Sequence, residues 1–129
     1  MCLVLTDSLM VSGYRVVQIR LLFELMLTPN HPLQGRQLAY VHVFTPLGPL
    51  SMCPHSQMYQ VSKLVHGVGN QAQPLGMVVE IASISRAIHL IPDYGSMIHP
   101  SLNAANCLDL CQNFWINCFL DKETYQAVY

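Results

Sequence analysis

Cysteine and histidine residues are the first side chains in this sequence whose spacing could support chemistry. Cys107 and Cys111 are separated by three residues, and Cys118 and the segment Cys53-Pro54-His55 supply further thiol and imidazole groups. Such spacing falls within the range used by structural zinc sites. However, Cys111 and Cys118 also belong to an apolar stripe, and free cysteine is among the most commonly buried residues. We therefore interpret these cysteines as core residues and expect no metal and no cofactor.

Nucleophilic and acid–base catalysis find little support in the pattern. Cys53 could pair with one of the histidines, but no known nucleophile signature surrounds it. Metal-dependent catalysis needs carboxylates held on rigid elements. Glu80 lies in a predicted strand, and the other candidate carboxylates fall in turn, helix or tail positions: Asp93, Asp109, Asp121 and Glu123. We therefore expect a protein that is not an enzyme.

Four aromatic residues form the best candidate binding site: Tyr40, Phe44, Tyr59 and Tyr94. In small barrels such residues either fill the core or line a groove for a peptide or a methylated lysine, whose cation lies over the ring faces. Taken one at a time, each ring is more often a packing residue. As a group, they are predicted to form an aromatic rim that contacts a partner.

Charge and hydropathy limit the classes of partner. Charged residues make up 10% of the 129 residues, the formal net charge is −1, and apolar residues make up 52%. Phosphate-backbone binding depends on clustered basic residues, and the six here are scattered: Arg15, Arg20, Arg36, Lys63, Arg86 and Lys122. We therefore expect weak or no autonomous nucleic-acid binding and an apolar surface that is partly covered in the complete assembly.

The cellular compartment of the protein is predicted from its longest apolar run, its first residues and its cysteines. The longest apolar run, 16–27, is interrupted by polar residues and is too short for a membrane span. The first residues lack a basic segment typical of a signal peptide. The odd number of cysteines fits reduced thiols rather than a disulfide framework. The sequence thus predicts a single intracellular domain.

The segment 77–92 is predicted to form the centre of the fold. It contains two runs rich in β-branched residues, around Val79 and around Ile91, which are typical of strands. The residues 82–87 between them are too few for a useful α-helix, so one 3₁₀ turn is the expected connection. Strand, 3₁₀ turn and strand in this order are how a small SH3-like barrel joins its last two strands.

The flanking segments extend this barrel. Residues 14–27 favour a strand, with a helix as the competing interpretation, and 28–35 is a loop rich in proline and glycine. Residues 38–44 alternate, with Leu38, Tyr40, His42 and Phe44 on one face and Ala39, Val41 and Val43 on the other. A further strand is predicted over 58–65, followed by a hairpin tip over 67–76.

A helix of about three turns is predicted near the C-terminal end. Leu108, Cys111, Phe114, Trp115 and Cys118 form an apolar stripe at helical spacing, and Asn103 or Asn106 is suited to cap its start. The predicted fold is therefore all-β, an SH3-like or BAH-like antiparallel barrel of five or six strands with a C-terminal α-helix. The expected divisions are an N-terminal extension or edge strand (1–13), the barrel (14–95), and a helix and tail packed on it (96–129).

Several strings occur together in an order that resembles one family. They are RVVQIR (15–20), LAYVHVFTP (38–46), MYQVS (58–62), HLIPDYG (89–95) and NFWINCFLD (113–121). Together they resemble the C-terminal region of proteins encoded by Plavaka-type transposons of basidiomycete fungi, within the CACTA group, over roughly residues 14–129. The chain departs from that pattern at 40–44, where the family has Tyr-Val-Glu-Trp-Phe, and at 87–88, where Ser-Cys is common.

The resemblance implies a module downstream of the transposase catalytic core, so no catalytic residue is transferred to this chain. We expect a non-catalytic, transposon-derived interaction module that binds protein or chromatin in the nucleus. Two alternatives remain open: an accessory DNA-contact domain that acts beside a basic partner domain, and a non-functional remnant of the transposon.

Overall fold

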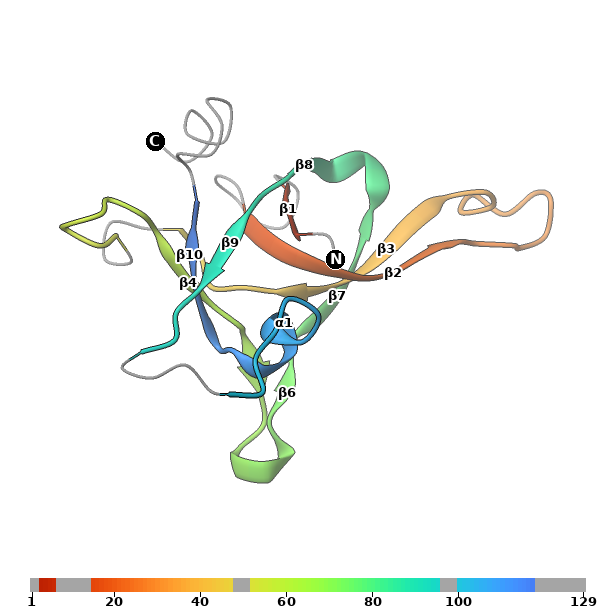
Figure 1. Cartoon of the computed structure of the whole chain (residues 1–129). Helices are drawn as coiled ribbons and strands as arrows, with labels where there is room; N and C mark the ends of the chain where they lie inside the picture. Colours follow the sequence, from red (N-terminus) through yellow and green to blue (C-terminus); the bar gives the residue numbers. More distant parts are fainter. Residues whose placement is uncertain (1–2, 7–14, 48–51, 96–99, 118–129) are drawn as a thin grey trace.

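Antiparallel β-structure dominates the chain (Figure 1). The structure is a computed structural model, and it describes residues 3–6, 15–47, 52–95 and 100–117. Its largest sheet has five strands in the spatial order β7 (Gly76–Glu80), β3 (Gln37–Val43), β2 (Arg15–Glu24), β1 (Leu3–Thr6) and β8 (Ile84–Ala87). Every neighbouring pair in this sheet is antiparallel.

A second sheet of three strands lies against the first (Figure 1). Its order is β4 (Gln60–Ser62), β10 (Asn113–Ile116) and β9 (Leu90–Pro92). The two sheets are joined where β3 ends, because Phe44 donates its backbone N–H to Val16 on one side and forms a bridge with Lys63 on the other. A small ribbon, β5 (Val65–His66) and β6 (Gln73–Pro74), is closed by the 3₁₀ turn η2 (Gly69–Gln71).

The connection between β7 and β8 shapes the large sheet. These strands form its two opposite edges, yet the 3₁₀ turn η3 (Ile81–Ser83) alone joins them, so the sheet must curl strongly. The Ser83 hydroxyl donates to the Glu80 carbonyl across this corner at 2.7 Å. The predicted 3₁₀ turn is confirmed at Ile81–Ser83, but the rest of the expected connection, 84–87, forms β8, and the second β-branched run forms β9 of the other sheet. The predicted barrel closure is not found, since no backbone pairing joins β7 to β8 among the described residues.

Two clusters of buried side chains stabilise this arrangement. The sheet core comes from one face of the five-stranded sheet: Val17, Ala39, Val41, Val43 and Val79. The intersheet core lies between the two sheets and the helix: Val16, Phe44, Val61, Ile88, Leu90, Leu108, Cys111, Phe114 and Ile116. Since successive side chains of a strand point to opposite faces, Val16 and Val17 place β2 between the two cores.

The strand predictions over 14–27 and 38–44 are confirmed by β2 and β3. Ala39, Val41 and Val43 are buried on one face of β3, as the alternation predicts, whereas Tyr40 on the other face is exposed. The N-terminal strand is not at an edge, because β1 pairs with both β2 and β8. The described residues also hold more strands than the five or six expected, since 58–65 is divided between β4 and β5 and a separate β9 joins the second sheet.

The predicted C-terminal helix is largely wrong. The helix α1 covers only Cys107–Leu110, and the next residues form β10, which pairs with β4 and β9. Phe114 and Ile116 are fully buried and alternate with Asn113 and Trp115, so this segment follows the two-residue period of a strand. The predicted apolar stripe combined residues of the helix α1 with residues of the strand β10, although the two elements have different side-chain periods. Cys118 and the predicted tail lie outside the described residues.

Candidate functional site

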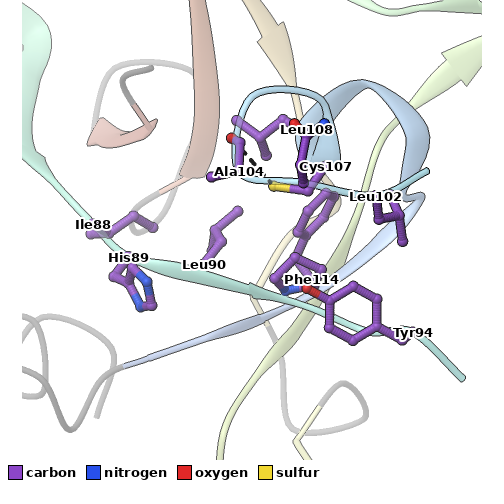
Figure 2. A pocket seen from close by; sticks show the side chains of 11 residues that line it. Ile88, His89, Leu90, Tyr94, Leu102, Ala104, Cys107, Leu108 and Phe114 are labelled. Carbon is purple, nitrogen blue, oxygen red and sulfur yellow. Dashed lines mark hydrogen bonds between the residues drawn. The ribbon is translucent and has the colours of Figure 1, made fainter. Parts of the chain in front are cut away.

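A pocket opens between β9 and the turn that precedes α1 (Figure 2). Its volume is about 440 Å³. None of the side chains that line it is Asp, Glu, Lys or Arg, and most are apolar. The lining consists of Ile88, His89, Leu90, Pro92, Tyr94, Leu102, Asn103, Ala104, Cys107, Leu108 and Phe114. A pocket of this size and lining is suited to an uncharged, largely apolar group.

Reciprocal hydrogen bonds between two asparagines build one wall of the pocket. The Asn103 side-chain oxygen accepts from the Asn106 backbone N–H at 3.2 Å, and the Asn106 side-chain oxygen accepts from the Asn103 backbone N–H at 2.8 Å. This is the geometry of a capping box. The Asn103 carbonyl also accepts from the Cys107 N–H at 3.0 Å, so the turn leads directly into α1. Of the two predicted capping residues, Asn106 is at the N-cap position of α1 without a side-chain cap hydrogen bond, and Asn103 begins the turn that this box closes.

The floor of the pocket belongs to the intersheet core. Leu108 is the buried residue of α1, Leu90 comes from β9 and Phe114 from β10. The Phe114 ring meets Phe44 edge to face, with ring centroids 5.8 Å apart. Because these groups are packed from below, the floor is formed before any ligand arrives.

Polar groups are confined to the rim. The His89 ring lies 3.2 Å from the Asn117 side-chain nitrogen through its Nδ1 atom, and Tyr94 is 39% exposed. The Cys107 thiol points toward the Ala104 carbonyl, with sulfur and oxygen 3.9 Å apart (Figure 2). These groups surround an apolar interior and can orient a ligand without charge.

The four predicted rim aromatics do not converge. Phe44 is fully buried in the intersheet core, and Tyr59 packs partly buried against that core. Tyr40 lies on the exposed face of β3, where its ring meets His42 edge to face at 5.7 Å. Tyr94 alone lines the pocket. These four rings therefore form no aromatic cage for a methylated lysine.

Sequence reasoning missed most of the pocket because its two walls come from segments far apart in the chain. The first wall is formed by 88–94 and the second by 102–108. The spacing of Asn103 and Asn106 was the local signal for the second wall. Nothing in the first segment indicated that β9 would leave the large sheet and face this turn.

Three of the candidate carboxylates have structural partners, whereas Asp121 and Glu123 lie outside the described residues. Glu80 forms an ion pair with Arg36, Asp109 lies 3.4 Å from Arg20, and the Asp93 carboxylate accepts from the Gln60 amide at 2.8 Å. Among the described residues, no group of three or more His, Cys, Asp or Glu side chains is arranged to hold a metal ion.

The thiols differ in their surroundings. Hydrogen bonds from Ser56 and from the His55 backbone lower the pKa of the Cys53 thiol, because they stabilise the thiolate. Burial raises the pKa of Cys111, which lies in the intersheet core. The core role predicted for Cys111 agrees with its position.

Among the described residues, the basic side chains do not form a stripe. Arg15 is buried, burial lowers its pKa, and its Nη2 donates to the Phe44 carbonyl at 2.9 Å. Burial also lowers the pKa of Lys63. Arg20 and Arg36 are engaged in the ion pairs described above, on different parts of β2 and the β2–β3 loop.

No protein-family model matches the chain, and neither a curated protein nor a solved structure shows significant similarity to it. Within the part of the chain that the structure describes, no helix has the length and apolar character needed to cross a membrane.

Proposed function

We propose that this protein is a non-enzymatic interaction module, which inserts an uncharged apolar side chain of a partner protein into the pocket between β9 and α1. The observation that carries the proposal is the lining of that pocket, which combines a preformed apolar floor with an uncharged polar rim. Burial of one large apolar side chain contributes about 1.5–3 kcal/mol. A charged side chain would lose its hydration there without gaining an opposite charge.

The edge of β9 argues for insertion of a side chain rather than addition of a strand. Asp93 donates its backbone N–H to Asn113 in β10 at 2.9 Å, so the nitrogen of the preceding residue faces away from β10. That residue is Pro92, which has no N–H to donate. The edge of β9 would therefore offer no backbone N–H at its centre to a peptide that paired with it.

The resemblance to Plavaka-type transposon proteins supports a transposon origin and a nuclear location for the module. The finer fold assignment belongs to the same proposal: the large sheet is a variant of an SH3-like or BAH-like barrel. Its support is the 3₁₀ corner η3, which joins the two edge strands of the sheet. The three-stranded sheet and α1 are then additions that create the pocket.

An accessory DNA-contact role is the competing proposal, and no feature of the described surface favours it. Arg15 is buried, and Arg20 and Arg36 lie beside carboxylates. A salt titration with duplex DNA separates the two proposals. Appreciable binding by the isolated chain that falls steeply with added salt would support the DNA role and contradict the protein-only role.

The pocket is tested directly with small side-chain mimics and amide NMR. The probes are N-acetyl-leucine amide and N-acetyl-phenylalanine amide, compared with Nα-acetyl-lysine amide. We expect saturable shifts at the amides of Leu102, Tyr94 and Cys107 with the apolar probes only. Equal responses to the lysine probe, or none to the apolar probes, would contradict the proposal.

A matched pair of variants tests whether the amide shifts come from binding in the pocket. Ala104 is an exposed residue of the pocket lining, so Ala104→Trp is expected to fill the pocket and abolish the shifts. Ala105 is also exposed, is the next residue in the same turn and is not part of that lining. Ala105→Trp should therefore leave the shifts intact. Loss of the response in both variants would assign it to the turn as a whole rather than to the pocket.

A further inference from the structure

The distal halves of β2 and β3 extend from the body of the molecule (Figure 1). They carry a second apolar surface, which shares no residue with the pocket lining. Cross-strand pairing aligns Leu21 of β2, Tyr40 of β3 and Val78 of β7 in one row. Cross-strand partners point to the same side of a sheet. Their exposed fractions are 58%, 37% and 55%, so the row is open to solvent.

The next row extends this surface. Phe23 pairs with Leu38, which pairs with Glu80, and both apolar side chains are half-buried. We name the set Leu21, Phe23, Leu38, Tyr40 and Val78 the apolar face. It lies on the side of the sheet opposite to the sheet core, because Ala39 and Val79 alternate with its members.

Tyr40 gives the apolar face a flat centre. A Cβ atom added to Gly76 would overlap the Tyr40 hydroxyl oxygen and lie 2.6 Å from the Cζ atom of the ring. The ring therefore lies down across β7, over the space that the glycine leaves. Tyrosine is among the residues that are enriched at the well-packed centres of protein interfaces.

The area is close to what one subunit contributes to a stable interface. Beyond the face, the loop at the end of the two strands exposes Met26, Leu27 and Leu33. With side-chain areas on the order of 150–200 Å², the face and the loop together expose on the order of 600 Å² of apolar surface. A standard interface buries about 800 Å² per partner.

The charges around this surface are of both signs. Arg36 and Glu80 form an ion pair beside the second row, and Arg20 and Glu24 are exposed on β2. In a two-fold contact the same surface of each copy faces the other in the reverse direction. The arginines of one copy can therefore approach the glutamates of the other. This composition suits a second copy of the chain better than a partner of one strong charge. The formal net charge of −1 adds little repulsion between copies.

We propose that the chain forms a two-fold symmetric homodimer through the apolar face. The interface is separate from the pocket, so each subunit keeps its own site for a partner side chain. Dimerisation would present two such sites in one assembly, which increases the avidity for a partner that carries two matching segments.

The experiment measures the mass of the whole chain in solution by analytical ultracentrifugation over a wide concentration range. We expect a monomer–dimer equilibrium for the natural sequence. Leu21→Glu should weaken the dimer by about tenfold or more, because it places a carboxylate within an apolar contact. Val78→Glu, at another exposed position of the same face, should have the same effect.

Leu22 provides a matched control. It is the same residue type as Leu21, is next to it in β2 and is 57% exposed, but it pairs with Ala39 and points to the opposite side of the sheet. Leu22→Glu should leave the dimer intact, and so should Ala104→Trp in the pocket. A natural chain that stays monomeric, a dimer that persists in both Leu21→Glu and Val78→Glu, or equal weakening by Leu22→Glu would each overturn the proposal. Far-UV circular dichroism verifies that each variant is folded.

Discussion

Gly76 and Tyr40 act as a pair in the large sheet. Because the Tyr40 ring occupies the space beside the glycine Cα, Gly76→Ala should displace the ring and lower the free energy of unfolding by about 1 kcal/mol. Tyr40→Ala removes the ring and opens that space. In the Tyr40→Ala background, Gly76→Ala should therefore cost little or even stabilise, since alanine restricts the unfolded chain more than glycine.

A double-mutant cycle by urea denaturation measures this coupling. The expected interaction energy is about 1 kcal/mol. Additive effects of the two substitutions would show that the tyrosine ring does not lie over the glycine in solution.

His42 predicts a pH dependence of stability. Burial, then Arg20 and Lys63, lower its pKa below the usual 6.5, while Asp109 acts in the opposite direction. The unfolded chain then binds a proton more readily than the folded chain, so stability is retained above about pH 6.5 and declines as pH falls through that value. The urea midpoint should be lower at about pH 5.5 than at about pH 7.5.

Replacement of His42 isolates its share of this effect. His42→Gln should reduce the difference between the two urea midpoints. His66→Gln, on the exposed β5–β6 ribbon, controls for the loss of one imidazole. A pH dependence that is unchanged in His42→Gln would contradict this assignment.

At the scale of the elements, the short helix α1 depends on the turn before it. Four residues are too few for a helix that is stable by itself. Asn103→Ala removes the side-chain acceptor for two backbone N–H groups, those of Ala105 and Asn106. We expect a loss of about 1 kcal/mol in unfolding free energy, together with faster amide exchange at Cys107 and Leu108.

Asn103→Asp is the matched variant. It keeps the oxygen acceptor and adds a negative charge near the start of α1, which is favourable there. Stability close to that of the natural chain is therefore expected. Equal losses in both variants, measured by urea denaturation, would show that the capping box does not stabilise the pocket wall.

At the scale of the whole molecule, β2 joins the two cores into one cooperative unit. Val16 belongs to the intersheet core and its neighbour Val17 to the sheet core. Ile116→Val in the first core should cost about 1 kcal/mol, and Val41→Ala in the second about 2 kcal/mol. Each substitution should lower the midpoint of one single unfolding transition.

Trp115 reports on whether the two cores unfold together, because it is the only tryptophan in the sequence and lies in the three-stranded sheet. Its fluorescence and the far-UV circular dichroism should change together in each variant. Val68→Ala, at a position 89% exposed, should leave the midpoint unchanged. A fluorescence change that precedes the circular dichroism in Ile116→Val would mean that the small sheet unfolds independently.

Local patterns in the sequence determined several of the strands and one corner of this protein. The alternation around Ala39 and Val41 predicted β3, the β-branched runs predicted β7, and the short segment after it predicted a 3₁₀ turn, because these preferences depend on neighbouring residues alone. The capping turn with Asn103 and Asn106 was recognisable for the same reason.

Tertiary structure alone decided which strands share a sheet and which side chains meet. Phe114 and Trp115 fitted the helical stripe by their spacing, but pairing with β4 and β9 selected a strand because it satisfies the backbone on both sides. The same long-range pairing buried Phe44, exposed Tyr40 and brought β9 against the turn before α1. Burial is a property of the completed packing, so the pocket and the apolar face could not be read from spacing along the chain.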